Sequence, residues 1–541
     1  MKLLSILVAV ALIAIVATEA QTPVAGPLIV PQPQSVNFGD QTLQLNPDKF
    51  QIETSSSSQV LAIAIKRYQQ LFFLFGAGKS SAPAATLNIK VASEDDTLDF
   101  GVSENYTISA TTDSLAIMAD TVYGAIRGLE SFSQMIIYDF ASQQYTLPFL
   151  PVVIVDFPRF PWRGIMIDSA RHFLPAAFIM HTIDALAYNK MNTLHWHVTD
   201  GQSYPISSAT FPNMTLGAWD PAATFSIADV QEIVAYGKTQ GVRVVPEFDV
   251  PSHTYSWGAA FPSIISNCPD SFNGNIGQYP LTPANNLTFE VLDALFTEYG
   301  GYFIDSYFHT GGDEMPLACW TQDPAIVEWM TDLGWTTVEA EQYFEDRLDA
   351  ILAPMKKTKL VWNDPFVNGV QLDPTTVIQV WDSSFQDIVN AGFNVIVSYN
   401  YYLDQQDPTG TVQWMFENTW TNFYDSDPFD GINSNLDKIL GGEACMWGEQ
   451  VDQLSIDVRV WPRAIGVSER LWSAQNQTDV NNALTRISPF TCRLSQRGIA
   501  SGPLSADFCM LPDDFESYLR GPRDRLTPDQ IKSLLVNNKK Q

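Results

Sequence analysis

One pattern repeats through the central part of the chain: a short apolar run, then a longer segment whose apolar residues have helical spacing. Eight such runs are predicted strands: Gly164–Ile167, Thr193–His197, Val242–Pro246, Tyr307–Thr310, Lys359–Trp362, Val377–Trp381, Asn394–Tyr399 and Ile439–Ala444. Helices are predicted between most of them, among others Ala177–Asn189, Ile227–Gln240, Thr337–Met355 and Phe385–Ala391. Because neighbouring parallel strands need a crossover helix, this order predicts an α/β fold, specifically a (β/α)8 TIM barrel.

A doubly wound open sheet would show the same order of elements. Such sheets commonly carry a G-x-G-x-x-G turn after the first strand, where the phosphates of a dinucleotide bind. No such turn follows Gly164–Ile167. The barrel is therefore the favoured interpretation, with the open sheet as the alternative.

The rest of the chain divides into three predicted parts. Residues 1–20 form a signal peptide, residues 21–156 a small α+β domain, and residues 157–541 the barrel with a C-terminal extension. Within the α+β domain, alternation and helical spacing predict three strands and two helices: Thr86–Val91, Asn105–Ala110, Ser114–Ala119, Gln59–Leu74 and Thr121–Ile137. Few catalytic residue types cluster there, so we expect a structural or docking role for this domain.

The N-terminus indicates the secretory route. Lys2 precedes the apolar run Leu3–Ala17, and Thr18-Glu19-Ala20 places small residues at the −3 and −1 positions of a cleavage after Ala20. No later segment reaches the ~18 consecutive apolar residues of a membrane span, so no membrane insertion is expected. Four sequons offer glycosylation sites at Asn105, Asn213, Asn286 and Asn476. Together these features predict a lysosomal or secreted protein.

Charge and composition exclude several classes of protein. The chain has 60 acidic against 30 basic residues, a formal net charge of −30, which argues against a nucleic-acid partner. With 45% hydrophobic and 17% charged residues it is neither disordered nor a coiled coil.

Five cysteines leave at least one without a partner in the chain. Cys492 and Cys509 are close in sequence, and Cys268 and Cys319 frame a longer loop. Pairing these four leaves Cys445 as the free thiol, and its apolar surroundings in the sequence predict that it is buried and inert.

A barrel places its active site at the carboxyl ends of the strands. Polar and aromatic residues follow every predicted strand, in chain order: Asp168 and Arg171; His195, His197 and Asp200; Glu247, Asp249 and His253; Asp313 and Glu314; Trp362, Asn363 and Asp364; Trp381 and Asp382; Tyr402 and Asp404; Trp447 and Glu449. Carboxylates transfer protons, whereas indole and phenol rings stack on sugar rings. This combination predicts a glycosidase.

The strongest single motif is His309-Thr-Gly-Gly-Asp313-Glu314. Its glycines let the backbone approach a ligand closely. Because adjacent side chains of an extended segment point in opposite directions, Asp313 and Glu314 are poorly placed to face each other across one glycosidic bond. Glu314 is instead predicted to be the general acid/base, and Asp313 to orient a nucleophile belonging to the substrate, such as a 2-acetamido oxygen. That is substrate-assisted catalysis.

These motifs carry a resemblance to a known family. The chain resembles the β-N-acetylhexosaminidases of glycoside hydrolase family 20, in particular the lysosomal type of eukaryotes. The matching segments are Arg163-Gly-Ile-Met-Ile-Asp168-Ser-Ala-Arg171-His-Phe-Leu-Pro175, His195-Trp-His-Val-Thr-Asp200, Pro246-Glu-Phe-Asp-Val-Pro-Ser-His253, His309-Thr-Gly-Gly-Asp-Glu314, Tyr402-Leu-Asp404 and Gly441-Gly-Glu-Ala-Cys-Met-Trp-Gly-Glu449. The resemblance extends over nearly the whole mature chain.

The resemblance implies a role for each site residue. Glu314 would be the proton donor, and Asp313 would hold the acetamido group during formation of an oxazolinium intermediate, with retention of configuration. The remaining substrate-binding residues would be Arg171, Asp404 and Glu449 on sugar hydroxyls, Trp362, Trp381 and Trp447 as pocket walls, Tyr402 on the acetamido oxygen, and Asp200 and His253 in support of Glu314. The substrate would be a glycan ending in GlcNAc or GalNAc.

The resemblance also implies that no metal or other cofactor is needed and that the protein is a homodimer. It supports the pairs Cys268–Cys319 and Cys492–Cys509. The disulfide that lysosomal members carry in the N-terminal domain is missing here, since no cysteine precedes Cys268. That domain must therefore be stable without a covalent link.

One departure concerns the substrate. Where members that accept sulfated sugars resemble Asn-Arg after the Tyr-Leu pair, this chain has Asp404-Gln405. Since Asp404 would repel an anionic sulfate, we expect preference for neutral terminal sugars.

Other interpretations of the motifs remain open at this point. His195 and His197 could be a zinc pair, but no third ligand stands at metal spacing. Trp362 and Trp381 could simply fill the core, and Asp168, Glu247, Asp249 and Asp364 could be buried hydrogen-bonded supports. The functional alternative is a lectin-like protein of the same fold that has lost catalysis, although such a protein would be expected to lose Asp313 or Glu314. A chitin-processing barrel of another family would carry a D-x-x-D-x-D-x-E strand end, which is absent.

Overall fold

The computed structural model describes residues 26–268, 279–382, 385–404, 419–512 and 525–536 of the 541-residue chain. The predicted signal peptide and Gln405 lie outside the described residues. Within the described ranges, no helix is both long and apolar enough to cross a membrane.

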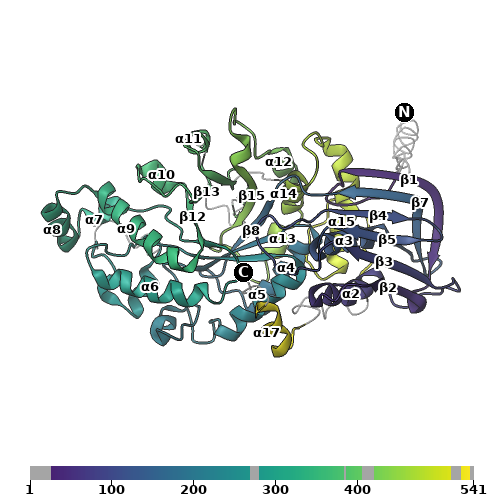
Figure 1. Ribbon diagram of the computed structural model, residues 1–541, viewed down its shortest axis with the longest axis horizontal. Helices are drawn as coiled ribbons and strands as arrows, with labels where there is room; N and C mark the ends of the chain where they lie inside the picture. The colour runs from purple at the N-terminus through teal and green to yellow at the C-terminus, as the bar shows by residue number, and fades with distance from the viewer. Residues whose placement is uncertain (1–25, 269–278, 383–384, 405–418, 513–524, 537–541) are drawn as a thin grey trace, which may run out of the picture.

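Eight parallel strands close into a barrel in the order β10-β11-β12-β13-β14-β15-β8-β9 (Figure 1). They are β8 (Trp162–Asp168), β9 (Thr193–Thr199), β10 (Arg243–Phe248), β11 (Tyr307–His309), β12 (Thr358–Trp362), β13 (Val377–Val380), β14 (Asn394–Val397) and β15 (Ile439–Met446). All eight predicted strands are present. The predicted barrel is confirmed, and the open-sheet alternative is wrong.

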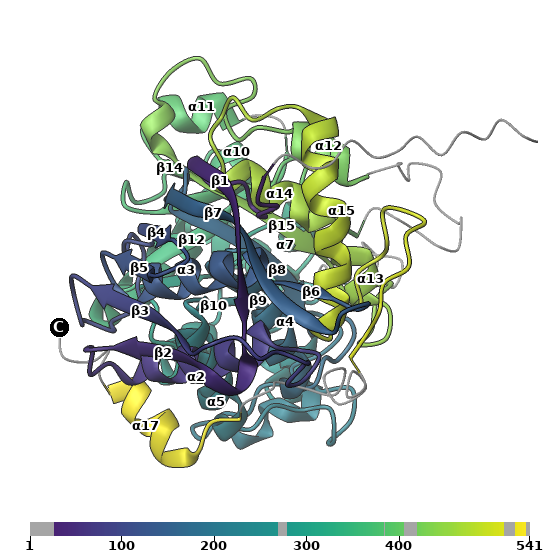
Figure 2. The same ribbon diagram turned by 90° about the vertical axis from the view of Figure 1, so that its right-hand side faces the viewer.

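Helices follow the strands and surround the barrel (Figure 1). They are α4 (Ala176–Tyr188), α5 (Ile227–Gln240), α6 (Asn286–Gly300), α7 (Leu317–Trp320), α8 (Pro324–Leu333), α9 (Thr337–Leu352), α10 (Asp364–Asn368), α11 (Phe385–Asn390), α12 (Trp420–Asp425), α13 (Ile456–Val460) and α14 (Arg463–Trp472). Beyond the barrel come α15 (Val480–Gln496) and α17 (Pro528–Val536), which packs on α5 (Figure 2).

Local sequence sets the ends of the long helices. Ser226 forms a capping box at the start of α5, and Gly241 ends that helix with a φ of 68° that glycine adopts without strain. The helix predicted to reach Met355 ends earlier, because α9 stops at Leu352 and a short 3-10 turn containing Pro354 follows. Proline has no N–H to continue the α-helical bonding.

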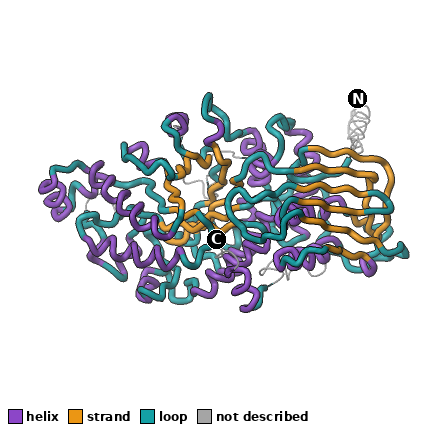
Figure 3. Tube along the Cα trace, in the orientation of Figure 1, coloured by secondary structure: helices purple, strands orange, loops and turns teal. Residues whose placement is uncertain are grey.

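The N-terminal sheet lies at one end of the molecule, apart from the barrel strands (Figure 3). Its strands run in the order β1-β7-β4-β5-β3-β2, with β6 paired to β7. Their bounds are β1 (Ser35–Leu45), β2 (Phe50–Thr54), β3 (Ala85–Val91), β4 (Tyr106–Ala110), β5 (Leu115–Ala119), β6 (Ile137–Asp139) and β7 (Gln144–Asp156). Helices α2 (Gln59–Phe72) and α3 (Val122–Met135) pack on the sheet. The predicted strands and helices are present, whereas β1, β2, β6 and β7 were not predicted.

Buried ion pairs join the N-terminal part to the barrel. Glu104 accepts hydrogen bonds from Arg127 of α3, at 2.7 Å, and from Arg163 of β8. Arg127 also donates to the backbone oxygen of Gly241 at the end of α5. Buried charges need such partners, so these contacts define how the sheet sits on the barrel.

The structure contains two disulfides, Cys268–Cys319 and Cys492–Cys509, and Cys445 is a buried free thiol. The first disulfide connects the loop after β10 to α7, which follows β11. It therefore links the chain segments that follow two neighbouring barrel strands.

Candidate active site

A pocket of about 310 Å³ opens at the carboxyl ends of the barrel strands. Most predicted site residues meet there, although they come from the ends of six different strands. The lining consists of Arg171, His253, Asp313, Glu314, Trp381, Tyr402, Asp404, Trp447, Glu449, Gln450 and Arg459.

The turn after β11 needs both of its glycines. Gly311 and Gly312 have φ of 71° and 95°. Their N–H groups donate to His309 Nδ1, at 2.9 Å, and to Asp249 Oδ1, at 3.0 Å. A Cβ on Gly311 would lie 1.8 Å from Asp249 Oδ1, which is impossible without a rearrangement. The turn therefore depends on the absence of a side chain at this position.

The two adjacent carboxylates occupy different environments. The Glu314 side chain is 47% exposed in the pocket, whereas that of Asp313 is 10% exposed. His253 Nε2 lies 3.5 Å from Glu314 Oε2 and 3.8 Å from Asp313 Oδ2. Because both carboxylates approach the same imidazole, they act on one side of the pocket rather than across it.

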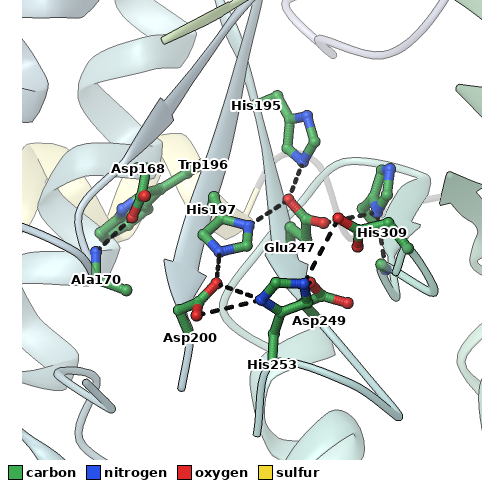
Figure 4. Close-up of polar contacts among 12 residues, drawn as sticks. Asp168, Ala170, His195, Trp196, His197, Asp200, Glu247, Asp249, His253 and His309 are labelled. Carbon is green, nitrogen blue, oxygen red and sulfur yellow. Dashed lines mark hydrogen bonds and ion pairs between the residues drawn. The ribbon is translucent and has the colours of Figure 1, made fainter. Parts of the chain in front are cut away.

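A buried ion cluster supports this imidazole (Figure 4). His253 Nδ1 lies 3.3 Å from Asp200 Oδ1, and Arg171 Nη2 lies 2.8 Å from Asp200 Oδ2. Burial alone would lower the pKa of His253, but the charges of Asp200, Asp249 and Asp313 raise it well above its usual value. Burial would raise the pKa of Asp200, but Arg171 and His253 hold it below its usual range. His253 is therefore an imidazolium held by a carboxylate.

Asp249 forms a carboxyl pair with Asp313. The two side chains are hydrogen-bonded, and His253 Nε2 lies 4.0 Å from Asp249 Oδ2. Burial and then the charge of Asp313 raise the pKa of Asp249 well above its usual value. Burial raises the pKa of Asp313 to about 6. Two buried carboxyl groups this close share a proton, and Asp249 is the one that keeps it.

Below the pocket, histidines and glutamates fill the barrel interior (Figure 4). His195 Nδ1 lies 2.6 Å from Glu443, and its Nε2 lies 3.0 Å from Glu247. His197 Nδ1 lies 2.6 Å from Glu247, and its Nε2 lies 2.9 Å from Asp200. Burial would lower the pKa of His195, but Glu443 and Glu247 raise it to about 9.

Three groups of these residues are close enough together to surround a metal ion: His195, Glu247 and His309; His197, Glu247 and Asp249; and Asp200, Asp249 and His253. His197 resembles His195 in its pKa. Burial would lower the pKa of His197, but the neighbouring carboxylates of Glu247 and Asp200 raise it well above its usual value. Protonated imidazoles have no lone pair to offer a metal. His309 is neutral, since burial lowers its pKa to about 3, but its Nδ1 already accepts the Gly311 N–H. As the structure stands, His195 and His197 form ion pairs with Glu443, Glu247 and Asp200.

Aromatic side chains form the walls of the pocket. Trp381, Tyr402 and Trp447 line it, and the Arg171 guanidinium lies 4.9 Å from the Trp447 ring centroid. Trp362 differs from the expected position, because it is fully buried beneath the lining and its Nε1 donates to Glu247 Oε1 at 2.7 Å. As the last residue of β12, Trp362 points into the barrel. Asp200 is likewise fully buried and does not line the pocket.

The polar wall carries Arg171, Asp404 and Glu449. Burial raises the pKa of Asp404 to about 7, and its Oδ1 has no hydrogen-bond partner among the described residues. Burial also raises the pKa of Glu449, against the pull of Arg171. Asp404 therefore presents a buried acceptor oxygen that no described residue satisfies.

Two lining residues were missed by the sequence analysis, Gln450 and Arg459. Arg459 lies on α13, and its guanidinium donates to the backbone oxygens of Gln450, at 3.0 Å, and Asp404, at 2.9 Å. Only residues directly after a strand were considered, and Arg459 comes well after β15, so no sequence signal identified it.

Comparison with known proteins agrees with this geometry. Residues 160–475 match the catalytic domain of glycosyl hydrolase family 20, and residues 29–135 match the domain described as beta-acetyl hexosaminidase like. The chain belongs to glycosyl hydrolase family 20, and it is a glycoside hydrolase.

Within that family, the chain is similar to proteins of one kind. It is 46% identical to beta-hexosaminidase subunit A1 of Dictyostelium discoideum, over 94% of this chain and 95% of the relative. It is 34% identical to the human beta-hexosaminidase subunit beta, over 94% and 95% respectively. Among solved structures, the chitobiase of Flavobacterium johnsoniae superimposes with a TM-score of 0.77 at 29% identity, covering 87% of this chain and 73% of that protein.

Proposed function

We propose that this glycoside hydrolase is an exo-acting, retaining β-N-acetylhexosaminidase that removes terminal non-reducing GlcNAc or GalNAc from glycoconjugates or chito-oligosaccharides. The observation that carries the proposal is the placement of Asp313 and Glu314 on one side of a pocket large enough for about one sugar residue. Two adjacent carboxylates that both face the His253 imidazole favour a joint role on one side of the bond over the ordinary pairing of nucleophile and acid on its two faces. We therefore propose that the nucleophile comes from the substrate.

In the proposed reaction, the carbonyl oxygen of the 2-acetamido group attacks C1 as Glu314 protonates the leaving oxygen. The C1–O bond breaks, and the positive charge spreads over an oxazolinium ring. Asp313 accepts a hydrogen bond from the acetamido N–H and stabilises that charge. Glu314 then removes a proton from water, which attacks C1 and reopens the ring with overall retention of configuration.

The surrounding residues have supporting roles in this proposal. Trp381 and Trp447 stack on the sugar ring, Tyr402 contacts the acetamido oxygen, and Trp362 supports the walls from below. Arg171, Asp404 and Glu449 bind sugar hydroxyls through charge-assisted hydrogen bonds. The His253 imidazolium, held by Asp200, faces both carboxylates. Its positive charge favours the ionised form of Asp313, which the acetamido N–H requires as an acceptor.

The test is hydrolysis of a chromogenic N-acetyl-β-glucosaminide by the wild type and by Glu314→Gln. We expect a loss of roughly 10²- to 10⁴-fold in kcat/KM, the range of general acid–base catalysis. Glu328→Gln, an exposed residue of α8, is the matched control and should retain full activity. Equal rates for the wild type and Glu314→Gln would remove the assignment.

A finer proposal concerns anionic substrates. The carboxylate of Asp404 faces the pocket, and two donors of the nearby Arg459 already bind backbone oxygens. We therefore propose preference for neutral sugars over 6-sulfated ones, strongest above pH 7, where Asp404 is ionised and repels the sulfate. Cleavage of a 6-sulfated substrate as fast as the neutral one would contradict this.

We also propose that the protein forms a homodimer. We further propose that it enters the secretory route and is located in the lysosome or outside the cell. The asparagines of all four sequons, Asn105, Asn213, Asn286 and Asn476, are exposed, and two disulfides are formed, which supports this route. Relatives named as subunits support the dimer. Sedimentation before and after enzymatic deglycosylation would test both statements. A monomeric mass would refute the dimer. A mass that does not fall on deglycosylation would show that no glycans are attached and would refute the secretory route.

A further inference from the structure

Asp364, which follows β12, binds residues that follow the two neighbouring strands, β11 and β13. It is the first residue of α10, and β12 lies between β11 and β13 in the barrel. One carboxylate oxygen, Oδ1, accepts the backbone N–H of Glu314 after β11, at 3.0 Å. The other, Oδ2, accepts the indole N–H of Trp381 after β13, at 2.7 Å. A single side chain thus binds both neighbours of its strand.

The first hydrogen bond acts on the backbone of the residue proposed to be the proton donor. Glu314 has a φ of 49°, in the left-handed region that residues other than glycine rarely adopt. Such a conformation persists only where the surroundings enforce it. Asp364 binds the N–H of this residue, and the ring of Pro365 stands 3.0 Å from where a Cβ of Gly312 would lie. The start of α10 therefore holds the turn from one side and directs the Glu314 side chain into the pocket.

The second hydrogen bond acts on a wall of the pocket. The backbone N–H of Trp381 donates to Asn363 Oδ1 at 2.9 Å, and its indole N–H donates to Asp364. Both ends of the tryptophan are thus held by consecutive residues. With backbone and indole both anchored, the ring plane that a sugar would stack on has little freedom to rotate.

We infer that Asp364 is a positioning residue that aligns the proton donor Glu314 with the stacking surface of Trp381, so that a sugar held on the indole presents its leaving oxygen to the acid. This inference rests on the proposed function, in which Glu314 protonates that oxygen. A carboxylate suits the task because it accepts at both oxygens, whereas an amide accepts at one and would turn its NH₂ group towards a donor.

The experiment compares two substrates in each variant. A 2,4-dinitrophenyl N-acetyl-β-glucosaminide has a leaving group that departs with little protonation, whereas an alkyl glycoside needs the acid. For Asp364→Asn we expect roughly a 10- to 100-fold loss of kcat/KM with the alkyl glycoside and less than about a 5-fold loss with the dinitrophenyl glycoside. Equal losses with both substrates would overturn the inference, because damage unrelated to the acid affects both.

Two further variants test whether the result is specific to Asp364. Asp373→Asn is the matched control, since Asp373 is an exposed carboxylate in the next loop that also accepts a backbone N–H, from Thr375. It should behave as the wild type. Trp381→Phe removes the indole donor and part of the stacking surface but leaves the Asp364–Glu314 hydrogen bond, so it should raise KM for both substrates without selectivity for the leaving group. If that variant instead shows the same selectivity as Asp364→Asn, the separate role for the Glu314 bond is wrong.

Glu314→Gln separates failure of the inference from failure of the proposed function. If Glu314→Gln loses activity equally with both substrates, the proposed function fails. If Glu314→Gln is selective and Asp364→Asn is not, the inference alone fails. Should Asp364→Asn not fold, as judged by circular dichroism, Asp364→Glu replaces it under the same criterion, because its longer side chain displaces the acceptor oxygens while keeping the charge.

Discussion

Replacing Asp249 would test whether the protonated carboxyl group of this residue holds the Asp313 carboxylate in place. Asp249 is fully buried, accepts the Gly312 N–H at 3.0 Å and is hydrogen-bonded to Asp313. Its pKa is raised well above the usual value by burial and by the charge of Asp313. The proton that Asp249 retains is therefore available to donate to Asp313.

Two substitutions separate the donor from the charge. Asp249→Asn keeps an oxygen for Gly312 and an N–H donor for Asp313, so we expect less than about a 10-fold loss in kcat/KM, or roughly 1.4 kcal/mol. Asp249→Leu strands the buried Gly312 N–H, at about 1–3 kcal/mol, and removes a hydrogen bond to a charged group, at about 1.5–3 kcal/mol. Together these terms predict a loss of roughly 10²- to 10⁴-fold.

The assay is kcat/KM for an aryl N-acetyl-β-glucosaminide, with circular dichroism to show that each variant is folded. Asp220→Asn is the control, since Asp220 is an exposed carboxylate that accepts the backbone N–H of Ala222. It should have wild-type activity. If Asp249→Asn is as slow as Asp249→Leu, the ionised form of Asp249 is the required one and the reasoning fails.

Three further predictions concern the turn, the disulfide and pH. Gly311→Ala should abolish hydrolysis while retaining the far-ultraviolet dichroism, because the added Cβ would lie 1.8 Å from a carboxylate oxygen at a φ of 71°; an active variant would contradict the geometry. Replacing Cys268 and Cys319 by serine opens a loop of 51 residues and should lower the free energy of unfolding by about 4 kcal/mol, as measured by urea titration. An unchanged free energy of unfolding would show instead that other contacts already hold the loop. Burial raises the pKa of Glu341 to about 8, so the folded state holds a proton that the unfolded chain releases, and the contribution of Glu341 to stability falls as pH rises from about 4.5 through 8. Glu341→Gln should therefore reduce the fall in Tm between pH 5 and pH 8, whereas Glu328→Gln should leave it unchanged; equal slopes for the two variants would refute the assignment.

The barrel strands were predictable because each is a short, mostly apolar run bounded by turn residues, and both faces of a parallel barrel strand are buried. Strands β1 and β7 were not predicted for the opposite reason. β1 is polar and exposed along most of its length, and β7 contains Pro148 and Pro151, which argue locally against a strand. Their pairing with each other is a long-range event, since β1 begins at Ser35 and meets Val155.

The candidate site shows the same division. The residues after each strand could be named in advance because barrel geometry brings all carboxyl ends to one face, and Asp313 and Glu314 could be singled out by the two glycines that precede them. Whether a named side chain touches the pocket could not be known. Trp362 is the last residue of β12 and Trp447 directly follows β15, yet the first is buried below the pocket and the second lines it.

By itself, the sequence determined the fold class, the strand ends from which the site is built, and the chemistry available there, since these depend on local periodicity and residue type. Only the tertiary structure decided which oxygen meets which hydrogen: that Asp249 pairs with Asp313, that Asp364 reaches both Glu314 and Trp381, and that Arg459 arrives from α13. The physical reason is that hydrogen bonds and pKa shifts depend on distances of a few ångströms between groups far apart in the chain, and closing the barrel is what sets those distances.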